Sequence, residues 1–347
     1  MDAALSSLRA VRLDEFDYEL PEAAIAQVPI EPRHAARLLV DRGSVSPEHR
    51  RVVDLPALLT PGDIVVVNET KVLPARLRLQ RATGGTAEVL LLEPLGPDRR
   101  RWEALVRPAR RLRAGEELAT LAGEPVVRVG ERTAAGDTFA VELVGSDDPL
   151  AVLERIGEMP LPPYIRTRLA DDDRYQTVYA RRPGSAAAPT AGLHFTPTVL
   201  DALAAAAIPV VAVELVVGLD TFQPVSVADP RAHRMHSERY HVPPATWAAV
   251  QAAERVVAVG TTSVRALETA AATGERTGRT ELFLHRGRPF HVVDVLLTNF
   301  HLPRTTLLMM IDAFVGPRWR DLYAIALRDG YRFLSFGDAM LLDRRAD

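Results

Sequence analysis

The sequence predicts an α/β domain that is interrupted by an inserted all-β domain. Two observations lead to this prediction. Apolar runs alternate with helical patterns in residues 1–67 and again from residue 150 to 347, which is typical of βα units packed around one core. Residues 68–149 instead show short alternating runs separated by glycine-rich turns, which is typical of a small antiparallel barrel or sandwich. We therefore expect an α/β domain at 1–67 and 150–347 and a β domain at 68–149.

The individual elements follow from the same periodicities. In the first segment Pro21 is expected to begin an amphipathic helix, and residues 38–40 and 64–67 are expected to form strands. In the β domain the alternating runs are 87–91, 102–106, 126–129 and 138–143. After residue 150 we expect helices near 199–207, 245–255, 264–268 and 306–314, and strands at 210–217, 256–259, 292–297 and 333–336. The stretch between residues 161 and 192 is rich in Pro, Gly, Ser and Asp, and such a long loop is expected to bind substrate or cover a site.

Composition excludes several classes of protein. The 347 residues are 47% apolar and carry a net charge of −3, which fits a globular protein and argues against a uniformly basic polyanion binder. The absence of cysteine excludes disulfides, thiolate nucleophiles and iron–sulfur clusters. We find neither a signal-peptide pattern nor an apolar run of about 20 residues, so a cytoplasmic protein without membrane contact is expected.

One local stretch is strongly basic. Between residues 98 and 113 seven arginines stand against Asp98 and Glu103. The arginines expected to contact RNA are Arg99, Arg100, Arg101, Arg110 and Arg111. A solvated surface that serves solubility alone remains the alternative interpretation.

Three polar segments are the candidate site. Residues 190–196, 260–263 and 298–303 are rich in Thr, Ser, His and Asn, and we expect these segments at three strand ends. Ligands of α/β folds gather outside the carboxyl ends of parallel strands, so these segments predict a ligand crevice. Ordinary helix caps are the alternative, since Thr and Ser commonly precede helices.

Several chemistries find little support in the sequence. It contains neither a dinucleotide fingerprint nor a phosphate-binding loop. The histidines at 233, 236 and 241 have no zinc-site spacing, so no metal is expected. A hydrolytic triad of Ser263 with His194 or His301 and Asp338 lacks the glycines of a nucleophile elbow.

Many motifs along the chain resemble the S-adenosylmethionine:tRNA ribosyltransferase-isomerase family of queuosine biosynthesis. They lie at residues 14–21, 61–63, 68–76, 157–165, 175–180, 190–197, 235–238, 259–267, 298–308 and 337–340. The resemblance implies an α/β domain of barrel-like form interrupted by a β-barrel domain. It also implies transfer and isomerisation of the ribosyl part of S-adenosylmethionine onto 7-aminomethyl-7-deazaguanine at the tRNA wobble position, with release of adenine and methionine. S-adenosylmethionine is then a co-substrate, no other cofactor is implied, and a monomer is expected.

The resemblance carries expectations for single residues. His194 or Asp338 is the expected general base. The residues expected to bind substrate are Thr190, Gly192, Phe195, Thr196, Thr261, Thr262, Ser263, Arg265, Asn299, His301, Asn68, Thr70, Arg76, His236 and Glu238.

The chain departs from the family pattern at a few positions. Val216 stands where many members have histidine, and Asp220 where they often have glycine. The turn Asn68-Glu69-Thr70 also differs. Either that histidine is not a universal base or the activity has changed. Two rival functions stay open: the same donor chemistry with a small free nucleophile, and a non-catalytic RNA-binding module.

Overall fold

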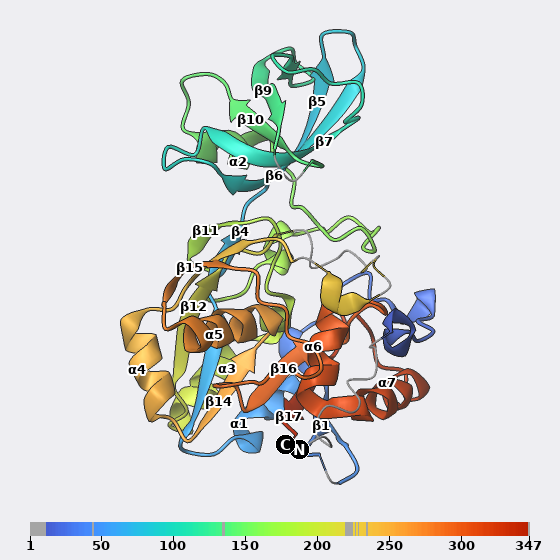
Figure 1. The fold of residues 1–347 in the computed structure, drawn as a ribbon, viewed down its shortest axis with the longest axis vertical. Helices are drawn as coiled ribbons and strands as arrows, with labels where there is room; N and C mark the ends of the chain where they lie inside the picture. Colours follow the sequence, from blue (N-terminus) through green and yellow to red (C-terminus); the bar gives the residue numbers. More distant parts are fainter. Residues whose placement is uncertain are drawn as a thin grey trace, which may run out of the picture.

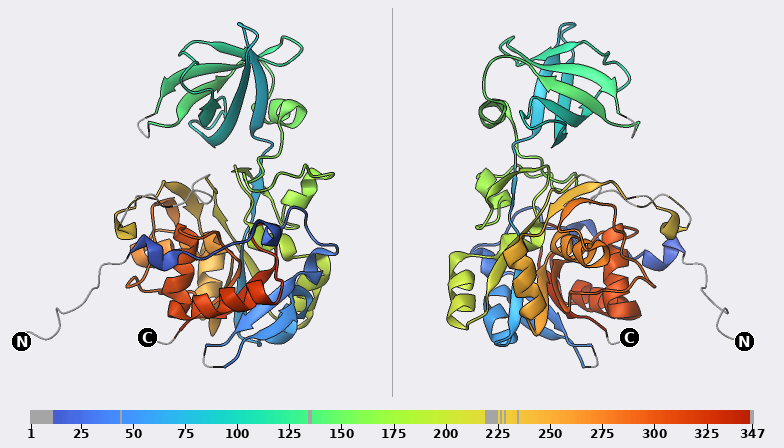
Figure 2. Two further views of the ribbon diagram at one scale, coloured as in Figure 1. Left: turned by 90° about the vertical axis from the view of Figure 1, so that its right-hand side faces the viewer. Right: turned by 60° about the vertical axis from the view of Figure 1, so that its left-hand side comes forward.

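The structure is a computed structural model that describes residues 12–43, 45–133, 136–218, 225, 227, 229–233 and 235–345. It has two parts, an α/β part and a β-barrel that stands at one end of it (Figure 1). The two views in Figure 2 show the same separation from other sides. None of the helices within these ranges has the length and apolar composition that crossing a membrane requires.

A nine-stranded mixed sheet forms the centre of the α/β part. Its strand order is β15-β13-β12-β3-β14-β16-β17-β1-β2. The strands are β1 (Arg37–Asp41), β2 (Glu48–Arg51), β3 (Asp63–Asn68), β12 (Val210–Leu215), β13 (Glu238–His241), β14 (Arg255–Val259), β15 (Thr277–Thr280), β16 (Val295–Asn299) and β17 (Ala339–Asp343). The neighbours β12, β3, β14 and β16 run parallel, so their carboxyl ends meet at one edge of the sheet.

Both faces of this sheet are covered. Along β3, Ile64 and Val66 belong to one apolar core, whereas Val65 and Val67 belong to a second one. This alternation follows from the two-residue period of a strand. The helices are α1 (Leu55–Leu58), α3 (Pro197–Ala205), α4 (Pro244–Ala252), α5 (Thr261–Thr273), α6 (Thr306–Val315) and α7 (Trp319–Arg328).

The inserted part is a closed antiparallel barrel of six strands in the order β10-β7-β6-β5-β8-β9. They are β5 (Arg76–Arg81), β6 (Thr86–Pro94), β7 (Arg101–Arg107), β8 (Glu117–Ala119), β9 (Pro125–Arg132) and β10 (Phe139–Leu143). The barrel has an apolar core of its own. The expected α/β domain with an inserted β-barrel is thus confirmed, and the sheet of its α/β part is open, with edges at β15 and β2.

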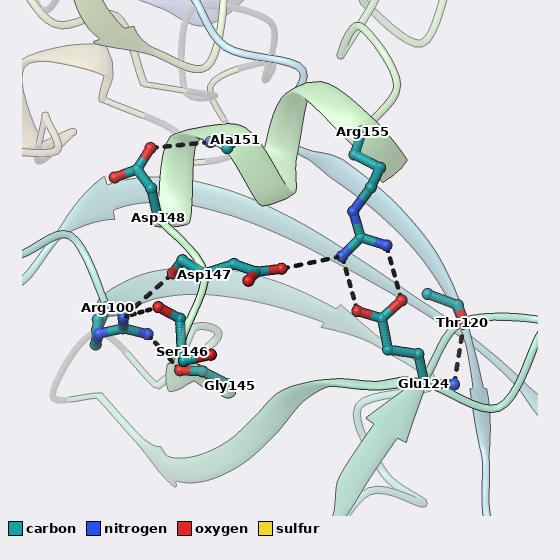
Figure 3. A network of polar contacts seen from close by, with 9 residues as sticks. All are labelled: Arg100, Thr120, Glu124, Gly145, Ser146, Asp147, Asp148, Ala151 and Arg155. Carbon is teal, nitrogen blue, oxygen red and sulfur yellow. Dashed lines mark hydrogen bonds and ion pairs between the residues drawn. The ribbon is translucent and has the colours of Figure 1, made fainter.

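Helix α2 (Pro149–Ile156) belongs to the barrel, since Val152 and Leu153 lie in the barrel core. Figure 3 shows the polar network that ties this helix down: Arg155 pairs with Glu124 in bidentate fashion, with both distances 2.7 Å. The short strand β4 (Thr70–Val72) instead pairs with β11 (Arg182–Ser185) of the α/β part. The expected boundary at 67/68 therefore separates β4 from the α/β part against which it packs. The expected boundary at 149/150 likewise separates α2 from the barrel.

Two expected elements were wrong, and one contact explains both. Pro21 precedes only a 3₁₀ turn at Glu22–Ala24, and residues 333–336 form a turn rather than a strand. The Phe333 amide donates to the carbonyl of Ala24, and the Ala26 amide donates to the carbonyl of Phe333. These bonds hold the first segment extended. Leu334 has a φ of 68°, which ends the extended backbone on the other side.

The chain leaves and re-enters the barrel through two adjacent segments. Arg76 and Glu158 exchange backbone hydrogen bonds of 3.2 and 2.8 Å. Next to them, a Cβ added to Gly157 would lie 1.8 Å from the carbonyl oxygen of Pro74. Only glycine therefore fits at this crossing.

We expect Gly157→Ala to lower the free energy of unfolding by about 2 kcal/mol or more, because the backbone segments must move apart. Gly85→Ala is the control, since an added Cβ there meets its nearest atom at an ordinary 3.7 Å. Denaturant titration of both variants measures the difference. Equal stability of the two would contradict the tight crossing.

Candidate active site

Three polar segments meet at the carboxyl ends of β14 and β16. The Gly260 amide donates to the Leu297 carbonyl at 2.8 Å, which aligns the ends of these strands. Thr190 Oγ1 donates to Asn299 Oδ1 at 2.9 Å and so attaches the 190–194 turn to the end of β16. Gly260 has a φ of 83°, and an added Cβ there would meet Ala191 at 3.6 Å. The three segments that the sequence singled out are thus brought together.

They surround a pocket, which we call the sheet-end pocket. Its polar groups include Thr190, Thr261, Thr262, Asn299 and His301. Its apolar walls include Tyr164, Ala191, Phe300, Leu302, Leu307 and Leu334. A pocket of this composition fits a ligand that has a flat apolar part and a few hydrogen-bonding groups.

Two further hollows continue from this pocket toward the barrel. Thr261 and Thr262 also line a middle pocket with Arg265. His236 and Glu238 line both the middle pocket and a third one, whose other side is formed by barrel residues that include Leu92, Glu103 and Thr138. We call the three hollows together the furrow. It leads from the ends of the sheet strands to the barrel.

A buried ion pair lies where the middle pocket meets the third. Arg265 of α5 pairs with Glu238 of β13, and their side chains are only 6% and 8% exposed. Glu238 Oε1 accepts the Gly218 amide at 2.8 Å, and Arg265 Nε donates to the Leu282 carbonyl at 3.1 Å. Because each charge is neutralised and hydrogen-bonded, the pair holds several segments of the furrow wall together.

The amino-terminal end of α5 faces the furrow. Thr261 and Thr262 are its first residues, and Gly260 offers no side-chain cap to their amides. Thr262 Oγ1 is buried without a hydrogen-bond partner among the described residues. A buried hydroxyl costs free energy unless it is bonded, so this atom is suited to accept or donate a bond to a ligand. Unpaired amides at a helix start favour negatively charged groups.

The two residues expected to act as base have different surroundings. The ring nitrogens of His194 face the carbonyls of Ala191 at 3.1 Å and Gly337 at 2.9 Å. Burial lowers its pKa, and the ring lines a small separate hollow rather than the furrow. Both carboxylate oxygens of Asp338 accept backbone amides, those of Arg37 and Arg332, at 2.8 Å. Both residues therefore hold turns that adjoin the sheet-end pocket.

His301 does lie in the sheet-end pocket. Its Nε2 contacts Thr298 Oγ1 at 2.9 Å, and burial lowers the pKa of its ring to about 3. The imidazole is therefore neutral at physiological pH. Asn299 beside it donates to the Asp338 carbonyl at 3.3 Å, so its amide orientation is fixed.

Other expected site residues point into the protein. Ser263 Oγ donates to the Val259 carbonyl at 2.8 Å and is fully buried, as is Phe195, which packs against Tyr179. Thr196 caps α3 through the Val199 amide. Gly192 lies against the Tyr179 ring, since an added Cβ would come within 2.0 Å of its hydroxyl.

The expected residues near the barrel crossing also serve the backbone. Asn68 Oδ1 accepts the amides of Thr70 and Leu215, and its Nδ2 donates to the Leu215 carbonyl. Arg76 Nη2 donates to the Leu161 carbonyl at 3.2 Å. The Asn68 contacts join β3 to β12, and the Arg76 contact joins β5 to the loop before residue 192.

The basic stretch is divided between the two ends of β7. Arg99 Nη2 donates to the Pro183 carbonyl of the α/β part, so this end of β7 faces the sheet. The three carbonyls of Gly145–Asp147 accept bonds from Arg100 (Figure 3). Arg110 and Arg111 follow the other end of β7 and are exposed. A seven-residue strand, about 20 Å long, separates the two groups.

The sequence did not single out Tyr164 and Ser335 as site residues. Both line the sheet-end pocket, and the Tyr164 hydroxyl contacts Ser335 Oγ at 2.7 Å. Burial raises the pKa of Tyr164. Tyr164 lies in one of the motifs that resemble the family, and this position could have identified it as a site residue. Ser335 lies in the segment that was expected to be a strand.

Comparison with known proteins decides the family. The model of the queuosine biosynthesis protein family matches residues 13–342. An S-adenosylmethionine:tRNA ribosyltransferase-isomerase from Moorella thermoacetica is 53% identical, with 96% of this chain and 100% of the relative covered. The chain belongs to this ribosyltransferase-isomerase family. A second member, from Symbiobacterium thermophilum, is 51% identical over 96% of this chain and 100% of its own length.

A solved structure of the family agrees with the fold. The crystal structure of S-adenosylmethionine tRNA ribosyltransferase from Thermotoga maritima is 36% identical to the chain. It covers 94% of this chain and 99% of its own, with a TM-score of 0.54. The resemblance read from the motifs is thereby confirmed.

Of the two departures from the family pattern, Val216 lies in the third hollow of the furrow, where it is buried. Its isopropyl group cannot accept a proton, so any base at this place must come from another residue. Asp220 lies outside the described residues.

The buried histidines predict that the free energy of unfolding decreases as the pH is lowered. Burial lowers the pKa of both His194 and His301 from 6.5. As pH falls below 6.5, the unfolded chain takes up protons that these folded rings do not, so stability is complete above that value and is lost below it. For His301 the cost approaches about 1.4 kcal/mol per pH unit below 6.5.

Thermal melting between pH 7.5 and pH 5 measures this effect. We expect His301→Gln to show a smaller loss of Tm over that range than the unsubstituted protein. His291→Gln is the control, because His291 is exposed. Parallel curves for all three proteins would be inconsistent with this account.

Proposed function

We propose that the protein transfers and isomerises the ribosyl part of S-adenosylmethionine onto 7-aminomethyl-7-deazaguanine at the wobble position of tRNA. Adenine and methionine leave, and the tRNA base becomes epoxyqueuosine. The observation that carries the proposal is the furrow. It joins a pocket suited to the donor at the sheet ends to an opening beside the barrel, where a macromolecular acceptor has access.

The donor occupies the sheet-end and middle pockets in this proposal. Adenine fits the apolar walls that include Tyr164 and Phe300. The methionine carboxylate suits the uncapped start of α5, where the amides of Thr261 and Thr262 have no side-chain cap. Thr262 Oγ1 then gains the partner that the described residues do not provide.

The proposed ribosyl transfer requires proton transfer and the exclusion of water. The sulfonium of the donor acidifies its adjacent C5′ protons, so a positioned base can begin the sequence that expels adenine. In this proposal His194 and Asp338 are positioning residues, because their polar atoms bond the backbone of Ala191, Gly337 and Arg332. The neutral His301 lies beside the donor. No resident metal or redox group is part of the proposal.

The proposal also includes the localisation and the oligomeric state of the protein. Its acceptor is a tRNA, which places the protein in the cytoplasm. We also propose that the protein acts as a monomer.

Adenine release is expected to depend on the modified tRNA, because the donor must not react before the acceptor amine is in place. Incubation of labelled S-adenosylmethionine with tRNA carrying the precursor base measures this. Unmodified tRNA is the matched control and should give background release. Equal release without any tRNA favours the small-nucleophile alternative, and no release at all favours the non-catalytic one.

Thr262→Val is expected to weaken binding of S-adenosylmethionine about 3- to 10-fold, because the variant keeps the shape but removes one hydrogen bond. Isothermal titration calorimetry measures the affinity. Thr273→Val at the other end of α5 is the control, since Thr273 Oγ1 donates to the Thr269 carbonyl within the helix. Equal affinities for both variants would remove Thr262 from the donor site.

A further inference from the structure

Cationic side chains from four chain segments converge on the short strand β11. Lys71 of β4 lies opposite Pro183 in the pairing of β4 with β11. Arg99 reaches the Pro183 carbonyl from the turn before β7, at 3.3 Å. A Cβ added to Gly184 would lie 3.9 Å from Arg239 Nη2 of β13. With Arg182 of β11 itself, these residues form what we call the junction cluster, at the foot of the barrel (Figure 1).

Most of this positive charge is not neutralised by the fold. Arg182 pairs with Glu69 at 3.0 Å and with Glu214 at 3.8 Å. In the part of the chain that the structure describes, no carboxylate pairs with Lys71, Arg99 or Arg239. Lys71 and Arg239 are also exposed. Gathering like charges costs electrostatic free energy. Because contacts within the fold do not offset this cost, the cluster is suited to bind an anionic partner.

The cluster lies directly beside the third hollow of the furrow. The same Cβ added to Gly184 would lie 3.9 Å from Val216 Cγ2, and Val216 lines that hollow. The hollow itself carries the carboxylates of Glu103 and Asp137, and its Glu93 is paired with Arg279. Phosphates are therefore attracted to the cluster and repelled from the hollow, whereas a cationic group is accepted by the hollow.

We propose that the junction cluster is the docking surface for the phosphate backbone of the tRNA, at the nucleotides that flank the base entering the furrow. The inference rests on the proposed function, since the aminomethyl group of the acceptor base is the cation that suits the acidic hollow. Backbone phosphates hold the register of an RNA, while the base is read elsewhere. The charge pattern separates these two tasks over adjacent surfaces.

The junction cluster is better placed to bind these phosphates than the exposed arginines at the other end of β7. Arg110 and Arg111 lie one strand length, about 20 Å, beyond the Arg99 end. Arg100 is bonded to three carbonyls within its own domain. Within the basic stretch, Arg99 bonds to β11, which lies beside the third hollow.

The double variant Lys71→Ala/Arg239→Ala tests the inference, because it leaves the Arg99 bond intact. We expect its tRNA affinity to fall about tenfold at moderate salt. The slope of log affinity against log salt should become shallower by about 1.4 to 1.8, since two phosphate contacts are lost. Filter binding at several salt concentrations measures both, and binding of S-adenosylmethionine should be unchanged.

Two comparison proteins make the test specific. Arg50→Ala/Arg328→Ala removes the same charge from exposed positions, with Arg50 on β2 at the opposite edge of the sheet from β13. The charge-preserving Lys71→Arg/Arg239→Lys should bind tRNA like the unsubstituted protein. Thermal melting verifies that all variants fold.

The outcomes separate the inference from the function on which it rests. If both charge-removing doubles bind tRNA alike, the junction cluster is not the docking surface, whatever the activity. If the unsubstituted protein binds tRNA through the cluster but releases no adenine, the inference stands and the proposed reaction fails.

Discussion

The ion pair between Arg265 and Glu238 is the interaction on which the furrow depends. Two charges with side chains less than a tenth exposed are tolerated only because they face each other and use their remaining polar atoms on backbone groups. Removing either partner leaves the other charge buried, which typically costs about 3–5 kcal/mol. The pair thereby fixes α5 against β13. It holds the uncapped start of the helix in line with the opening beside the barrel.

The fold could be predicted because its determinants are local and repeated. Strands such as β3 and β14 show continuous apolar runs, and the barrel strands show period-two alternation with glycine turns. The failures at Pro21 and at residues 333–336 arose from one contact between distant segments. Backbone bonds between Ala24 and Phe333 have no signature in either segment alone.

The meeting of the three polar segments could be predicted, whereas the role of each side chain could not. Polar segments after strands indicated a candidate ligand crevice, and the structure brings Thr190, Thr262 and Asn299 together at one pocket. Sequence alone does not reveal which way a polar side chain points. His194 and Asp338 have reactive groups that here bond backbone atoms, and Ser263 bonds back to the end of β14. The residue types suggested proton transfer or nucleophilic attack, but in the fold the same side-chain atoms form hydrogen bonds to the backbone.

The barrel is attached by ties of unequal strength. At the crossing, Arg76 and Glu158 share two backbone bonds beside a glycine that admits no side chain. Elsewhere the ion pair of Glu93 with Arg279 joins the barrel to β15, and the arginine side chain of that pair is half exposed. An exposed pair contributes only about 0–1 kcal/mol. The crossing therefore fixes the barrel firmly at one place, whereas the ion pair adds little to the free energy of its attachment.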